Sequence, residues 1–86
     1  QVFSFDILVS GDTAPEYVQL QIYTLDGRLA YMGKMDERLH VGTNSITWNA
    51  QDISGNNMPA GIYIYQIVIK AGENQMRRNG KLSLIR

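Results

Sequence analysis

The sequence predicts an all-β fold, a sandwich of about seven short antiparallel strands. Three observations lead to this prediction. Short runs of residues alternate between apolar and polar, Gly, Asp and Asn signal turns between these runs, and no stretch has the 3.6-residue period of an amphipathic helix. Such spacing is typical of immunoglobulin-like (Ig-like) sandwiches. With 86 residues, of which 44% are hydrophobic, residues 1–86 are expected to form one domain around one core.

The first half of the chain contains three expected strands. Residues 2–9 and 17–24 carry an apolar side chain at every second position, so each strand should bury one face. Asp26-Gly27 lies between two strand runs and is the strongest short signal for a β-hairpin. The return strand of this hairpin is expected over residues 28–32.

The middle of the chain is the least regular part. Residues 33–42 are charged, lie between two glycines and are too few for a secure helix, so we expect a loop or a poorly defined strand. Residues 43–49 alternate again and place Ile46 and Trp48 on one face. A strand is therefore expected to end near the single tryptophan.

Two further strands are expected in the last third. Residues 62–70 form the longest strand signal and are rich in Tyr and Ile on both faces, which indicates a central strand. After a turn at residues 71–74, residues 75–86 return with Leu82 and Leu84 pointing inward.

Composition excludes several classes of chemistry. The chain has no cysteine, which excludes disulfides, thiolate nucleophiles and Cys-ligated zinc. It has no apolar run of the length that a membrane helix needs, and the chain is expected not to insert into a membrane. Because it begins at Gln1 in strand-like sequence without a basic and apolar leader, we interpret it as a piece of a longer protein.

Charge is balanced over the whole chain but not along it. Eight basic and eight acidic residues give a net charge of zero. Arg77, Arg78, Lys81 and Arg86 lie in the last ten residues, which contain no acid. This end could face an acidic partner or phosphates, or it could be an edge strand that charge protects from pairing. The second interpretation is the simpler one, and no nucleic-acid partner is predicted.

The sequence gives little evidence for catalytic or metal-binding groups. His40 is the single histidine and has no nucleophile in a recognisable motif beside it. Residues 52–57 faintly resemble a calcium loop, but Gly55 takes the fourth position instead of the sixth, and Tyr63 stands where the bidentate Glu belongs. Asx turns explain this loop as well. Asp36-Glu37 is interpreted as solvated loop charge.

The five tyrosines could form a platform for stacking sugars or bases if they were exposed, although strand aromatics are more often core residues. Because no group of residues indicates catalysis, the sequence predicts a non-catalytic domain without a cofactor or a bound metal.

The most distinctive stretch runs from Trp48 to Tyr63. A strand ends at Trp48, a polar Asx/Gly loop follows, and Pro59-Ala60-Gly61 leads into the central strand. With its flanks, this stretch resembles the FlgD-type Ig-like domain of bacteria, and the resemblance covers nearly the whole chain. The matching residues are Phe3 and Phe5, Tyr23 with Asp26-Gly27-Arg28, Gly42 with Trp48-Asn49, Asp52 with Gly55, Pro59-Ala60-Gly61-Ile62-Tyr63-Ile64-Tyr65, and Gly80-Lys81-Leu82.

The sequence is also similar to the C-terminal sorting domains of the type IX (Por) secretion system. Those domains share the Asp-Gly-Arg/Lys hairpin, the Gly-x-Tyr strand and a final strand with basic and apolar residues. In this chain the corresponding strand, and the predicted recognition strand, is Lys81-Leu82-Ser83-Leu84-Ile85-Arg86. A partner could recognise such an edge through strand addition or charge.

The resemblance and the tyrosines together leave three alternative functions. The first is a sorting and docking domain that outer-membrane translocation and attachment machinery recognises, at the end of an exported protein such as the system's own cysteine-peptidase-type sortase. This protein would cross the periplasm and reach the cell surface. The second is a structural FlgD-like module, in a hook cap or as a spacer that contacts other domains of its parent protein. The third is a carbohydrate-binding accessory domain.

Overall fold

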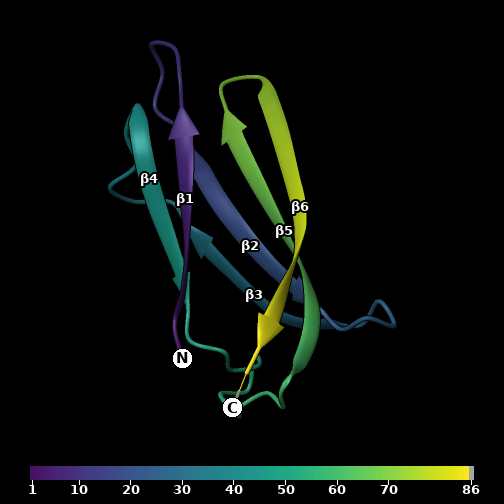
Figure 1. Cartoon of the computed structure of the whole chain (residues 1–86). Helices are drawn as coiled ribbons and strands as arrows, with labels where there is room; N and C mark the ends of the chain where they lie inside the picture. Colours follow the sequence, from purple (N-terminus) through teal and green to yellow (C-terminus); the bar gives the residue numbers. More distant parts are fainter. Residues whose placement is uncertain (86) are drawn as a thin grey trace.

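The computed structural model describes residues 1–85 and confirms the all-β sandwich. It contains six strands, close to the predicted number of about seven (Figure 1). They are β1 (Phe3–Val9), β2 (Tyr17–Tyr23), β3 (Leu29–Met35), β4 (Gly42–Trp48), β5 (Gly61–Ala71) and β6 (Asn74–Leu84). Among the described residues, no helix is long and apolar enough to cross a membrane.

The strands form two antiparallel sheets. A two-stranded sheet pairs β1 with β4, and a four-stranded sheet has the order β3-β2-β5-β6 (Figure 1). β5 pairs with β2 on one side and with β6 on the other, which confirms the prediction that the Tyr/Ile-rich strand is central. The predicted hairpin at Asp26-Gly27 joins β2 and β3.

Residues 33–42, which were predicted to be a loop or a poorly defined strand, begin with the regular end of β3. Gly33 is part of β3 and pairs with Leu20 of β2, so the strand continues to Met35 before the loop of residues 36–41. The ring of Tyr31 lies over Gly33, and a Cβ added at Gly33 would be 2.6 Å from the Tyr31 hydroxyl. A glycine that would normally weaken a strand is thus covered by an aromatic ring.

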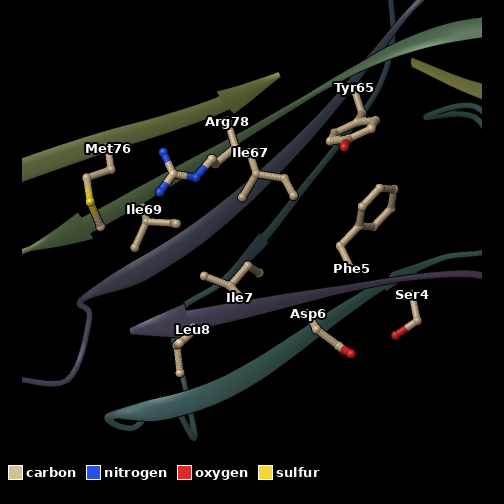
Figure 2. A pocket seen from close by; sticks show the side chains of 10 residues that line it. All are labelled: Ser4, Phe5, Asp6, Ile7, Leu8, Tyr65, Ile67, Ile69, Met76 and Arg78. Atoms are coloured by element: carbon tan, nitrogen blue, oxygen red, sulfur yellow. The ribbon is translucent and has the colours of Figure 1, made fainter. Parts of the chain in front are cut away.

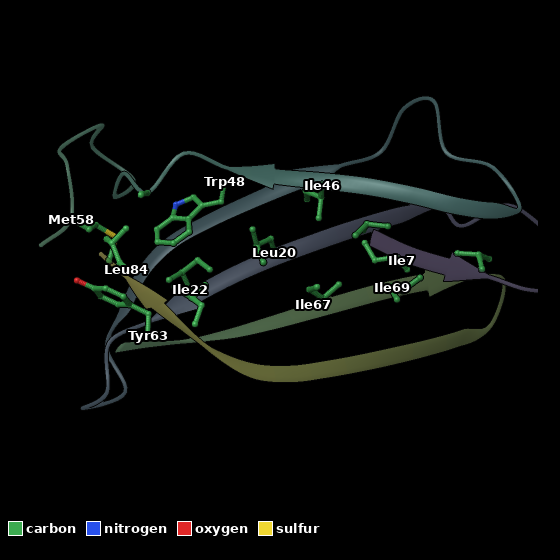
Figure 3. Close-up of a cluster of buried hydrophobic side chains, with 14 residues drawn as sticks. Ile7, Leu20, Ile22, Ile46, Trp48, Met58, Tyr63, Ile67, Ile69 and Leu84 are labelled. Carbon is green, nitrogen blue, oxygen red and sulfur yellow. The ribbon is translucent and has the colours of Figure 1, made fainter. Parts of the chain in front are cut away.

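Strand alternation builds the core. Val18, Leu20 and Ile22 of β2 are completely buried, and Trp48 is only 1% exposed. Figure 3 shows Trp48, Met58, Tyr63 and Leu84 gathered at one end of the core; we call these four residues the Trp48 end. Burying each large side chain contributes about 1.5–3 kcal/mol, which a small domain without disulfides requires.

The two sheets do not cover each other completely. β1 packs toward β5, since the rings of Phe5 and Tyr65 are 4.9 Å apart, and β4 packs toward β3, since Tyr31 and Trp48 are 6.0 Å apart. The first half of β6, residues 74–79, is exposed. Hollows separate this half of β6 from β1.

Candidate functional site

The predicted recognition strand is divided between core and surface. Leu82 and Leu84 are 9% and 2% exposed and belong to the hydrophobic core, as the alternation predicted. Lys81, Ser83 and Ile85 are exposed. Arg86 lies outside the described residues. Within the described part of this strand, a partner could therefore contact these three side chains and the outer backbone edge of β6.

The basic residues of β6 point to opposite faces of the sheet. The register with β5 is continuous, so the even-numbered residues of β6 share the inner face with Leu82 and Leu84. Arg78 consequently points to the side of the two-stranded sheet, whereas Arg77 and Lys81 point away from it. Arg77, Arg78 and Lys81, which lie close together in the sequence, therefore do not form one basic patch in the structure.

Side chains of the Trp48-to-Tyr63 stretch form hydrogen bonds with the backbone of the same stretch. The indole Nε1 of Trp48 donates a hydrogen bond to the Gln51 carbonyl at 2.9 Å, and the Tyr63 hydroxyl donates to the Pro59 carbonyl at 2.6 Å. The rings of Trp48 and Tyr63 meet edge to face, with centroids 6.5 Å apart. Pro59 and Tyr63 are thus architectural, and Gly61 is the first residue of β5.

The loop itself is an Asx turn, as the sequence indicated. The Asp52 carboxylate accepts hydrogen bonds from the backbone amides of Ser54 and Asn56 at 3.0 and 2.9 Å. Gly55 has a φ of 86°, in the left-handed region that favours glycine. Among residues 1–85, no group of three or more His, Cys, Asp or Glu residues is arranged to hold a metal ion.

The hairpin at Asp26-Gly27 is closed by Thr24. The Thr24 hydroxyl donates to the Asp26 carboxylate and accepts from the Arg28 amide, and Gly27 has a φ of 90°. The hydrogen bond from Thr24 lowers the pKa of the Asp26 carboxyl below its ordinary value. A hollow of about 310 Å³ is lined by residues of this hairpin and of the Asx loop, among them Arg28 and Asp52.

The tyrosines are not fully exposed. Tyr63 is buried, and the other four are half-buried. Tyr65 packs on Phe5, and Tyr31 packs on Trp48. For Tyr31, Tyr63 and Tyr65, the interpretation as core residues is confirmed.

His40 is part of a turn that a buried asparagine holds. Asn44 is 3% exposed, accepts a hydrogen bond from the His40 amide at 3.0 Å and donates to the His40 carbonyl at 2.7 Å. The imidazole Nδ1 lies 3.0 Å from the Val41 carbonyl. Sequence reasoning missed Asn44, although a polar residue at an inward position of a strand is a signal that could have found it.

Sequence reasoning also missed a hollow on the described surface. A groove of about 550 Å³ runs between the edge of β1 and the inner face of β5 and β6 (Figure 2). We call it the β1–β6 groove. The groove exists because the two sheets do not cover each other completely. Arg78 lies four residues before Leu82 and therefore on the same inward face, and this position was the signal in the sequence. Its lining includes Phe5, Ile7, Tyr65, Ile67, Ile69, Met76 and Arg78.

The six strands define an antiparallel β-sandwich of two sheets. No family model and no curated protein sequence matches the chain. A solved structure of FlgD from P. aeruginosa is similar, with a TM-score of 0.74 and 19% sequence identity over 96% of this chain. The chain spans 62% of the length of that FlgD chain. This likeness establishes the fold, and function is considered separately.

Proposed function

We propose that the chain is a structural FlgD-like Ig module, a non-catalytic building unit of a larger bacterial protein. The observation that carries this proposal is the likeness to the FlgD fold over 96% of the chain. The polar groups of its most distinctive stretch also support it, because Trp48, Asp52 and Tyr63 form hydrogen bonds within their own loop. These contacts hold a strand connection in place.

A structural module should fold without its parent protein. We expect residues 1–86 expressed alone to unfold in one cooperative transition. The calorimetric and van't Hoff enthalpies should agree at about 60 kcal/mol, the value typical of a domain of this size. A broad transition, or a van't Hoff enthalpy far below the calorimetric one, would show that the chain depends on neighbouring domains.

The second candidate is the type IX sorting domain, recognised by outer-membrane machinery and displayed at the cell surface. Two observations favour it over the carbohydrate-binding alternative. β6 is an edge strand of its sheet, and Lys81 and Ser83 are exposed on it. The half-buried tyrosines offer no comparable surface for a sugar.

Secretion distinguishes the two candidates. Residues 1–86 are fused to the C-terminus of a periplasmic reporter in a bacterium that has the type IX system. A structural module leaves the reporter in the periplasm, whereas a sorting domain delivers it to the surface. Deletion of residues 81–86 would remove Leu82 and Leu84 from the core, so the better matched control is the double variant Lys81→Glu, Ser83→Glu. This variant alters exposed side chains, and thermal unfolding checks that it still folds.

A further inference from the structure

The β1–β6 groove has an open backbone edge along one side. β1 pairs with β4, and among residues 1–85 no strand pairs with the opposite edge of β1. The floor of the groove is the inner face of β5 and β6, with Ile67, Ile69 and Met76 (Figure 2). An unpaired edge beside an apolar floor is the arrangement that accepts an added strand.

The groove is bounded by two strands that do not pair with each other. Residues 4–8 of β1 lie on one side, and Met76 and Arg78 of β6 lie on the other. An added strand would pair with β1 at the usual spacing of about 4.8 Å. A second hollow of about 480 Å³ continues the groove past Leu8 and Met76, which contribute to both. The opening therefore runs along β1 toward its C-terminal end.

The chemistry of the groove selects its occupant. Met76 is 39% exposed and Phe5 is half-buried, so apolar area is available for alternate side chains of an added strand. Arg78 brings a positive charge to the same face. Asp6 also lines the groove, but its carboxylate accepts a hydrogen bond from the Ser45 hydroxyl of β4. An inward-pointing charge opposes the entry of an apolar strand without a counter-charge.

We propose that the β1–β6 groove binds an extended peptide segment that adds to β1 as a third strand. Its alternate side chains are apolar and cover Ile69 and Met76, and one of them is Asp or Glu and pairs with Arg78. The backbone of β1 supplies affinity for any extended chain, and Arg78 makes the groove select an acidic one. This inference holds for a structural module and for a sorting domain alike.

The occupant is a single extended segment. The unpaired edge of β1 offers seven residues for a ladder, and Arg78 supplies the charge for an acidic side chain. Pairing of β1 edges between two copies is the alternative that the experiment must detect.

The test uses ¹⁵N-labelled residues 1–86 and a capped peptide with the sequence Thr-Val-Thr-Asp-Thr-Val-Thr, which is as long as β1. A matched peptide carries Lys in place of Asp. We expect the Asp peptide to shift the amide resonances of residues 4–8 and 76–80 and to bind about tenfold more tightly than the Lys peptide, because one attraction is replaced by one repulsion. An Asp peptide N-methylated at alternate residues should not bind, since it cannot form the ladder with β1.

The variant Arg78→Glu completes the design, and its side chain is exposed, so the fold should persist. It should reverse the preference and favour the Lys peptide. The proposal is overturned if millimolar Asp peptide shifts no resonance of β1. It is also overturned if the two peptides bind equally to both proteins, or if sedimentation without peptide shows a dimer whose contacts are those same β1 amides.

Discussion

The two ends of the sandwich differ in how completely the sheets close on each other. At the Trp48 end, the indole packs on Phe3 at 5.5 Å and on Tyr63 at 6.5 Å, and the Asx loop covers it. At the β1–β6 groove, the same two sheets leave Met76 and Arg78 exposed. The closed end provides stability, and the open end provides surface. The predictions below test this division, from the largest expected effect to the smallest.

The substitution Trp48→Ala should have the largest effect, a loss of about 3–5 kcal/mol in the free energy of unfolding, because it leaves a cavity among buried side chains. Urea unfolding followed by circular dichroism measures it. The matched substitution Met76→Ala in the groove should cost less than about 0.5 kcal/mol, as at other exposed positions. Similar losses at the two sites would remove the distinction between closed and open ends.

β6 contains the same contrast within one strand. Leu84→Ala should cost about 2–5 kcal/mol, because the side chain is 2% exposed and belongs to the core. Lys81→Ala, three residues away and exposed, should change stability by no more than about 0.5 kcal/mol. Midpoints of denaturant unfolding compare the two variants. A large loss for Lys81→Ala would mean that this side chain is part of the fold and not free for a partner.

Asp52→Ala should cost about 1–2 kcal/mol, since it removes the acceptor for two backbone amides of the Asx turn. Asp52→Asn keeps an acceptor oxygen at this position and should recover most of the loss. Thermal unfolding compares the variants. Equal destabilisation by Ala and Asn would show that the negative charge of Asp52, and not its acceptor, stabilises the loop.

The smallest expected effect concerns the hairpin. The pKa of Asp26 is lower in the folded protein than in the unfolded chain, because Thr24 donates to its carboxylate. The associated stabilisation is therefore present above the unfolded pKa and is lost as the pH falls through the folded pKa. Carboxyl NMR titration measures the pKa of Asp26. In the variant Thr24→Val it should rise toward the ordinary value, while a fully exposed carboxylate keeps the effect on stability small.

Local pattern predicted most of the fold. Period-two alternation located the strands, and Asp26-Gly27 located the hairpin, because both signals depend on neighbouring residues. Gly33 misled the prediction, since glycine indicates a strand end unless another side chain, here the Tyr31 ring, covers it. That contact depends on the conformation of the strand, so residue types alone do not predict it.

The candidate site was harder to predict than the fold. The alternation of β6 separates Arg77 from Arg78, so a run of basic residues in the sequence became two faces in the structure. The groove depends on which strands pair and which edge of β1 is left unpaired, and strand order is a long-range property that local patterns do not contain. The Asx loop could be predicted because Asp52 binds residues close to it in the chain.

The pairing of β1 also has a consequence for the order of folding. Its register joins Phe3 to Trp48 and Val9 to Gly42, whereas β2–β3 and β5–β6 are hairpins between neighbouring strands. Closing the long loop between β1 and β4 costs more chain entropy than forming either hairpin. We expect β1 to dock last, so substitutions in β1 should accelerate unfolding and leave the folding rate nearly unchanged.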